Sequence, residues 1–308
     1  MSAVPTDPTS LLPIRLRLPA TSANLGPGFD ALGLAMSLYL TIEAEVSQTG
    51  AFLIEATGRD AEACSQIDNN LIFTTYVDML ANAGRLAPRL HLRMNNEIPL
   101  GMGCGSSAAA LLAGVLLANH FGQLGWNGQQ ILEEACRREG HPDNVAACYC
   151  GGMTVSSMSD ITVKTVTYRE NINWNLLLVL PAEGLSTSKA RAMLPAQYSR
   201  EDAVANIQAT ALLVSAFALN RGDLLATAMR DRIHQPYRME ACPLLKKLLP
   251  LSGTEGILGV ALSGAGPSVL LVTEDHIETA IKAAERAVEG PVEIVQTSIA
   301  MGAEVGNL

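Results

Sequence analysis

The residues with the clearest chemical potential lie in a glycine-rich stretch at 98–108, which reads Ile-Pro-Leu-Gly-Met-Gly-Cys-Gly-Ser-Ser-Ala. Three glycines at alternate positions precede two serines and an apolar run that ends at Ala118. Glycine lets a backbone turn tightly and approach a ligand, and a loop that enters a helix directs free N–H groups and the positive end of the helix dipole at one point. The pattern predicts a phosphate-binding loop; the alternative is a glycine-rich turn before a buried helix.

Two well-known phosphate loops do not fit this stretch. A Walker loop needs Lys after its last glycine, where Ser106 stands, and a dinucleotide-binding loop needs G-x-G-x-x-G with an acidic residue roughly 20 positions further on. Here the spacing is G-x-G-x-G, and residues 122–128 contain no acid. The stretch therefore predicts a phosphate loop of another type, in which a serine at the helix start could also offer its hydroxyl to Mg²⁺.

Two further segments group polar side chains beside small residues. Residues 19–30 follow a predicted strand and bring the amide of Asn24 near the carboxylate of Asp30. Residues 139–144, Glu-Gly-His-Pro-Asp-Asn, pack ionisable groups into a tight turn. The first segment also fits an ordinary strand-to-helix turn, and the second a solvated helix end. Because residues 145–152 are apolar and small, we expect the second segment to face a cleft.

Two arginines and one turn complete the candidate segments. Arg191 ends Ser-Thr-Ser-Lys-Ala-Arg at 186–191, and Arg238 ends His-Gln-Pro-Tyr-Arg at 234–238. An arginine can grip a carboxylate through two parallel hydrogen bonds, although each of these also fits an ordinary surface arginine. Residues 263–268, Ser-Gly-Ala-Gly-Pro-Ser, lie between two apolar runs and fit either a hairpin turn or a second backbone-lined wall of a cleft.

The composition argues against several classes of protein. The chain has 308 residues, 48% of them hydrophobic and 4% aromatic, and its formal net charge of −9 disfavours a surface for nucleic acid or an anionic membrane. Met1 to Pro13 lacks a signal-peptide pattern, and the longest apolar run, 108–118, is too short to span a bilayer. None of the six cysteines forms C-x-x-C, so we expect reduced, buried thiols and a cytoplasmic location.

The elements that must position these groups are strands and helices mixed along the whole chain. Apolar patterns predict strands at 14–18, 38–46, 89–94, 151–168, 176–180, 259–262, 269–272 and 292–298. Helical spacing predicts helices at 70–83 (capped by Asn69 or Asn70), 108–118, 129–138, 200–220, 223–233 and 276–289. The softest boundary lies near 168–175, which predicts two α+β domains, 1–170 and 171–308, that share a cleft.

Six segments together resemble the GHMP kinases, and among them the homoserine kinase family. The family's opening segment stands entire at 19–30, its loop Pro-x-Gly-x-Gly-Leu-Gly-Ser-Ser-Ala at 99–108, and its Gly-His-Pro-Asp-Asn-Val-Ala segment at 140–146; the others stand at 186–191, 234–238 and 263–268. They occur in family order over about residues 14–300. Cys104 replaces the loop's usual leucine, and residues 147–150 depart from the usual run, but neither change removes a functional group.

The resemblance implies a two-domain α+β fold. Its N-terminal, ATP-binding domain would resemble the second domain of ribosomal protein S5, and its C-terminal domain would be ferredoxin-like. It also implies transfer of the γ-phosphoryl group of ATP, with Mg²⁺, to the side-chain hydroxyl of L-homoserine, a step toward threonine. A homodimer is consistent with it, as is an adenine pocket lined by apolar residues between about Leu53 and Met94.

The same resemblance assigns roles around the phosphates. The loop that would hold the triphosphate comprises Pro99, Leu100, Gly101, Met102, Gly103, Cys104, Gly105, Ser106, Ser107 and Ala108. Ser107 and Glu133 would contact Mg²⁺, with Glu134 and Glu139 as alternatives.

The acceptor would be held by side chains from the other segments. Its carboxylate suits Arg191 and Arg238, and its ammonium suits Asp30. The groups expected around its hydroxyl are Asn24, Asp143, Thr187 and His141, with Gly264 in the second wall. Asn24, Asp143 and Thr187 are the catalytic candidates; Asp143 is either a general base or a binding group only.

Two other functions stay open. The chain could phosphorylate another small alcohol such as mevalonate, which Asp30 disfavours because such an acceptor has no amine. It could also be a non-catalytic sensor that binds nucleotide, which the complete set of polar groups disfavours.

Overall fold

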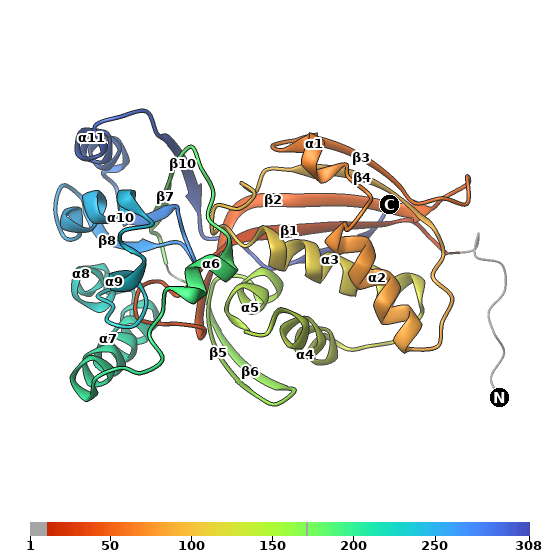
Figure 1. Ribbon diagram of the computed structural model, residues 1–308, viewed down its shortest axis with the longest axis horizontal. Helices are drawn as coiled ribbons and strands as arrows, with labels where there is room; N and C mark the ends of the chain where they lie inside the picture. The colour runs from red at the N-terminus through yellow and green to blue at the C-terminus, as the bar shows by residue number, and fades with distance from the viewer. Residues whose placement is uncertain (1–10, 171) are drawn as a thin grey trace.

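Residues 11–170 and 172–308 are described by a computed structural model, in which two sheets carry packed helices (Figure 1). The side chain of Thr187 lies outside the described part. The first sheet has the order β11-β1-β2-β4-β3, with β5 paired to β2 and β6 to β5. Its strands are β1 (Ile14–Ala23), β2 (Leu32–Val46), β3 (Leu53–Gly58), β4 (Leu90–Asn96), β5 (Met153–Ser159), β6 (Thr162–Tyr168) and β11 (Glu304–Asn307). Its paired strands run antiparallel except β3 and β4, which are parallel.

Helix α3 (Ser106–Phe121) is the centre of the helical layer on this sheet (Figure 1). It contacts the other helices of the layer, α2 (Leu71–Asn82), α4 (Gly128–Glu139) and α5 (Asp143–Cys150), while α1 (Ala61–Cys64) lies against β3. Eleven residues of α3 are buried. A helix that is apolar on every side must be covered on every side, and the predicted buried helix is confirmed.

The second sheet has the order β10-β7-β9-β8. Its antiparallel strands are β7 (Asn175–Leu180), β8 (Ile257–Leu262), β9 (Val269–Thr273) and β10 (Glu293–Ser298). Helices α6 (Thr187–Ala192), α7 (Arg200–Ala218), α8 (Leu225–Ala228), α9 (Gln235–Arg238) and α10 (Pro243–Leu248), with 3₁₀ turns at 222–224 and 249–251, separate β7 from β8, and α11 (Ile277–Val288) separates β9 from β10. Numbered along the chain, these strands stand in the order 4-1-3-2, which is the ferredoxin-like arrangement that the resemblance implied.

Two segments cross between the two sheets. Strand β11, near the end of the chain, returns to pair with β1. The turn between β1 and β2 reaches the other way, toward α7, where Asn206 and Thr210 donate hydrogen bonds to the Pro27 carbonyl at 2.7 and 2.9 Å. The division into 1–170 and 171–308 stays a prediction, because residue 171 is not described and β11 belongs to the first sheet.

The prediction of one helix over 223–233 is wrong. Helix α8 ends at Ala228, and helical structure resumes only at Gln235. Asp231 explains the break, because its carboxylate accepts hydrogen bonds from the backbone N–H groups of Ile233, His234 and Gln235 at 2.8, 3.0 and 2.6 Å. Such side-chain bonds compete with those of a helix.

The strand predicted over 292–298 is confirmed as β10, but the prediction that it is the last strand is wrong, because β11 follows it. Sequence patterns likewise do not predict β3. Both strands lie at edges of the first sheet, and all four residues of β11 are exposed, so they lack the apolar alternation that marks a half-buried strand. Asn70 is confirmed as the cap of α2, where its side chain accepts from the Ile72 N–H.

No helix within 11–170 and 172–308 is long and apolar enough to cross a membrane. The six cysteines are free thiols, and four of them are buried.

We predict that Gly105→Ala destabilises the protein more than Gly101→Ala. Both glycines have a positive φ, +71° and +69°, which costs an L-residue about 1 kcal/mol. A Cβ at Gly105 would also overlap Oγ1 of Thr21 on β1, whereas a Cβ at Gly101 would meet open space. Overpacking adds about 1–3 kcal/mol. Thermal unfolding of the two variants measures the difference, and equal melting temperatures would contradict the close packing of the loop on β1.

Candidate active site

The predicted site segments converge on one cavity of about 240 Å³, which we call the central cavity. It is lined by Ala23, Asn24, Phe29, Asp30, Gly101, Gly103, Cys104, Gly105, Ser106, Ser107, Ala108, Glu139, His141, Asp143, Asn144, Leu185, Ser186, Arg191, Arg238, Gly264 and Ala265. Residues separated by up to about 240 positions in the sequence therefore share one hollow. Of the predicted loop residues, Pro99 and Met102 do not line it, and Leu100 lines a neighbouring pocket.

The glycine loop turns its carbonyls into the protein. The Gly101 carbonyl accepts from the Leu185 N–H, and the Cys104 carbonyl accepts from the Thr21 N–H. The Met102 and Gly103 carbonyls accept from side chains, the hydroxyls of Ser268 and Ser263. Within the described residues, the N–H groups of 101–105 have no protein acceptor.

This arrangement makes a concave anion site at the start of α3. Positive φ angles at the three glycines, between +69° and +75°, turn successive N–H groups toward one side. The dipole of α3 adds positive potential at the same end.

An ion pair lines one side of the cavity. The two terminal nitrogens of Arg191 on α6, Nη1 and Nη2, donate to the carboxylate of Asp30 at 3.0 and 2.6 Å. This hydrogen bond is the main reason that the pKa of Arg191 is raised. The two side chains expected to hold opposite ends of a zwitterion thus hold each other in this structure.

Arg238, on α9, is the buried cation of the cavity. It is only 2% exposed, and within the described residues no carboxylate lies within 4 Å of its guanidinium. Its Nε donates to the Ala190 carbonyl at 3.2 Å, and its Nη1 to the Gly264 carbonyl at 3.3 Å. Burial, followed by the nearby charge of Arg191, lowers its pKa. Burying a cation without a paired anion costs free energy, so a bound anion would stabilise this guanidinium.

Asn24 supports the loop that carries Asp30. Its Nδ2 donates to the Gly264 carbonyl at 3.0 Å, and its Oδ1 accepts from the Asp30 N–H at 3.0 Å. Both ends of the amide are therefore engaged by backbone, and the predicted contact with a substrate hydroxyl stays a prediction. Gly264 lies in the second wall as expected and contributes its carbonyl to both Asn24 and Arg238.

Asp143 begins helix α5 with its side chain 2% exposed. Its Oδ1 accepts from the Asn144 N–H at 2.7 Å and lies 2.6 Å from Nδ1 of His141. Within the described part of the chain, no donor reaches Oδ2, so this oxygen is free to meet a ligand in the cavity. The Thr187 prediction falls on a side chain outside the described part.

The role of Glu133 as a metal ligand stays a prediction, and the structure places its carboxylate away from the central cavity. Its Oε1 accepts from the Gln129 amide at 2.8 Å and from the Val163 N–H at 3.4 Å, and it does not line the central cavity. Glu139, six residues later on α4, does line it. Six residues turn a helix by about 240°, so the two carboxylates point to different sides.

Burial raises the pKa of the Glu139 carboxyl, and the charge of Asp143 adds to that rise, while His141, Arg191 and the Ser107 hydroxyl oppose it. The Glu139 carboxylate and the Ser107 hydroxyl both line the cavity and offer the kind of oxygen atoms that a hard cation binds.

A second pocket of about 240 Å³ shares Ser106 with the first, and part of its lining falls between residues 53 and 94, where an adenine pocket was predicted without named residues. It is lined by Leu40, Ala63, Cys64, Gln66, Asp68, Asn69, Asn70, Leu71, Ile72, Met94, Asn96, Ile98, Leu100, Ser106 and Ala110. These residues come from strands, helices and turns with no local motif, so only the fold assembles them. Phe29 and Asn144 also line the central cavity, and the Thr21 hydroxyl donates to Oδ1 of Asn144 at 2.7 Å. Their segments were recognised in the sequence, but no role was assigned to these residues.

Family comparisons agree with this geometry. Residues 70–152 match the GHMP kinases N terminal domain, and residues 213–290 match the GHMP kinases C terminal family. Homoserine kinase of Solibacter usitatus is 46% identical over 88% of both chains, and that of Saccharomyces cerevisiae is 32% identical over 86% of this chain and 89% of its own. The chain belongs to the homoserine kinase family of the GHMP kinases.

Solved structures show the same fold for this homoserine kinase family member. Homoserine kinase from Cytophaga hutchinsonii superposes with a TM-score of 0.79 at 25% identity, covering 98% of this chain and all of that one. Mevalonate diphosphate decarboxylase from Enterococcus faecalis has a TM-score of 0.68 at 14% identity, covering 97% of this chain and all of that one, which shows the fold alone.

We predict that Asp143→Asn lowers the pKa of His141. Burial favours the neutral imidazole, but the hydrogen bond and charge of Asp143 outweigh it, so the pKa of His141 is raised in the folded protein. The stability that this pair contributes is complete below about pH 6.5 and is lost as pH rises through the raised pKa. An NMR titration of the His141 ring, identified by its loss in His141→Gln, measures the shift. An unchanged titration in Asp143→Asn would contradict the coupling.

Proposed function

We propose that this protein transfers the γ-phosphoryl group of ATP to the side-chain hydroxyl of L-homoserine, giving O-phospho-L-homoserine and ADP. The observation that carries the proposal is the charge pattern of the central cavity. A buried arginine without a carboxylate lies beside an Asp30–Arg191 pair, and all three face the same hollow as the anion site at the start of α3.

This pattern suits an α-amino acid. The substrate carboxylate would take the free donors of Arg238 and one face of Arg191, and its ammonium would take Asp30. Binding would thus exchange the present Asp30–Arg191 pair for two pairs with the substrate. Mevalonate has a carboxylate but no amine, so it would offer Asp30 no ammonium group to bind.

The reaction needs positioning more than covalent chemistry from the protein. The acceptor oxygen attacks the γ-phosphorus, the bond from that phosphorus to the bridging oxygen breaks, and ADP carries away that oxygen. The hydroxyl proton goes either to Oδ2 of Asp143 or to the transferred phosphate. The free N–H groups of the glycine loop would stabilise the charge on the phosphates.

ATP would lie across both pockets, with its phosphates on the glycine loop and its base in the second pocket, which adjoins the loop at Ser106. Ser107 and Glu139 are the residues that would hold Mg²⁺ there, and the ion would neutralise phosphate charge. A step toward threonine, a cytoplasmic location and a homodimer are further predictions from the family resemblance.

The direct test is a coupled assay for ADP with ATP, Mg²⁺ and either L-homoserine or mevalonate. We expect turnover with homoserine only. Arg191→Ala and Arg238→Ala should each raise the homoserine KM about 30-fold, because a hydrogen bond to a charged group contributes about 2 kcal/mol. Arg232→Ala is the matched control, since Arg232 is exposed and outside the cavity. Turnover with mevalonate, or an unchanged KM in both arginine variants, would overturn the proposal.

A second experiment tests the metal ligand. Glu139→Gln should raise the Mg²⁺ concentration for half-maximal rate by about tenfold, because a neutral amide binds a hard cation more weakly than a carboxylate does. Glu133→Gln, from the same helix, should leave that concentration unchanged. Both concentrations are measured at saturating ATP and homoserine. A larger rise in Glu133→Gln than in Glu139→Gln would instead favour Glu133 as the metal ligand.

A further inference from the structure

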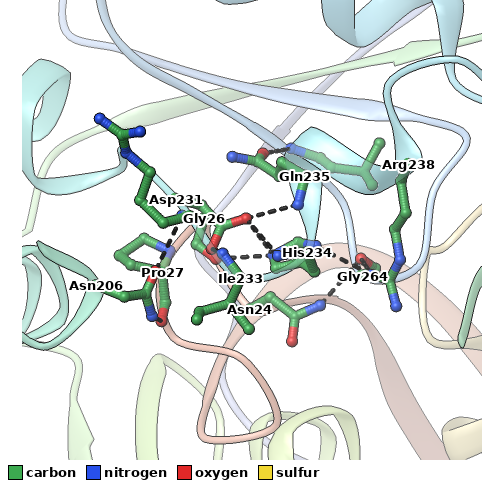
Figure 2. Close-up of polar contacts among 12 residues, drawn as sticks. Asn24, Gly26, Pro27, Asn206, Asp231, Ile233, His234, Gln235, Arg238 and Gly264 are labelled. Atoms are coloured by element: carbon green, nitrogen blue, oxygen red, sulfur yellow. Dashed lines mark hydrogen bonds and ion pairs between the residues drawn. The ribbon is translucent and has the colours of Figure 1, made fainter. Parts of the chain in front are cut away.

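His234 lies at the start of α9 with its ring fully buried, between the β1–β2 turn and Arg238 (Figure 2). Its Nε2 lies 2.8 Å from the Gly26 carbonyl, and its Nδ1 lies 3.1 Å from Nη1 of Arg238. A carbonyl can only accept and a guanidinium can only donate. Both contacts are hydrogen bonds only if Nε2 carries a proton and Nδ1 carries none, so the two neighbours select one neutral tautomer.

We infer that His234 is a positioning residue for the proposed reaction: through its bare Nδ1 it orients Arg238 toward the substrate carboxylate, while its Nε2–H fixes the β1–β2 turn that carries Asp30. The inference rests on the proposed function for its substrate. His234 would therefore position both the group that binds the substrate carboxylate, Arg238, and the group that binds its ammonium, Asp30.

The contacts of Arg238 show why this support matters. Nη1 is shared between His234 and the Gly264 carbonyl, and the latter contact is the longer, at 3.3 Å. Nε is committed to the Ala190 carbonyl. Within the described residues, Nη2 has no protein acceptor and is left for a ligand. Without Nδ1 of His234, the guanidinium keeps two backbone contacts and is freer to rotate.

Phe29 joins the same arrangement. The centroid of the Phe29 ring lies 5.4 Å from that of the His234 ring. The guanidinium carbons of Arg191 and Arg238 lie 5.5 and 5.6 Å from the same Phe29 centroid. His234, Arg191 and Arg238 are thus ordered around one aromatic ring at the end of the β1–β2 turn.

The charged groups near the ring are consistent with a neutral histidine. Oδ2 of Asp231 is 3.6 Å from Nε2, but this carboxylate already accepts three backbone N–H groups. Burial lowers the pKa of His234, and Arg238 acts in the same direction, while Asp231 and the more distant Asp30 oppose them.

Two amide variants test the contributions of the two ring nitrogens separately. The amide of His234→Asn can place its oxygen near the Nδ1 position and accept from Arg238, but it does not reach Gly26. The amide of His234→Gln can place its nitrogen near the Nε2 position and donate to Gly26, but it leaves no acceptor for Arg238. We expect His234→Gln to raise the homoserine KM about tenfold with kcat and the ATP KM within about twofold, and His234→Asn to recover most of that loss.

A double-mutant cycle tests whether His234 changes the homoserine KM by way of Arg238. If it does, His234→Gln adds little to the homoserine KM of Arg238→Ala. Full additivity, equal KM values for the Asn and Gln variants, or an equal rise in the ATP KM would each overturn the inference. Absence of homoserine turnover by the unaltered protein would instead overturn the proposed function.

The ¹⁵N NMR spectrum of the unaltered protein provides a test that needs neither a variant nor turnover. We expect the His234 ring, assigned through its bonds to its own backbone, to be protonated at Nε2 and bare at Nδ1 at neutral pH. A proton on Nδ1 would overturn the inference even if both variants failed to fold.

Discussion

A buried guanidinium without a carboxylate partner is the constraint on which the rest of the site depends. Removing a cation from water costs several kcal/mol unless other groups solvate it. The protein solvates Arg238 with the carbonyls of Ala190 and Gly264 and with one nitrogen of His234. These partners come from α6, from the turn after β8 and from the start of α9, so the position of the charge fixes the relative positions of three segments. The incomplete neutralisation is what leaves affinity for an anion in the cavity.

The same contacts join the two halves of the chain. Starting from Asn24, hydrogen bonds lead to Gly264, then to Arg238, His234 and Gly26, which is two residues from the starting point (Figure 2). A turn from the N-terminal sheet is therefore held by groups that belong to the C-terminal half. The glycine loop is held in the same way, because Ser263 and Ser268 donate to its carbonyls. Donor phosphate and acceptor must meet within a few ångströms for transfer, and this cross-linking keeps their two supports together.

Much of the site was predictable because chemistry confines some functions to local sequence. A loop with alternate glycines before an apolar helix can be recognised anywhere, since the conformations it needs are open mainly to glycine. Two carboxylates of α4 show where such reasoning stops. Glu133 and Glu139 belong to one helix and differ by six positions, and only the orientation of α4 against α3 decides which carboxylate faces Ser107. The helix predicted over 223–233 failed for a related reason, since one carboxylate, that of Asp231, captured three backbone donors.

The sequence by itself determined the types of group available and the local turns that display them: the glycine loop, the ionisable turn at 139–144 and the two arginine segments. Only the tertiary structure decided how they combine. It paired Arg191 with Asp30, left Arg238 without a carboxylate, and selected one tautomer of His234. The physical reason is that hydrogen bonding and burial depend on distances between segments that are far apart in the chain. A residue's type sets what it can donate or accept, and its neighbours in space set what it does.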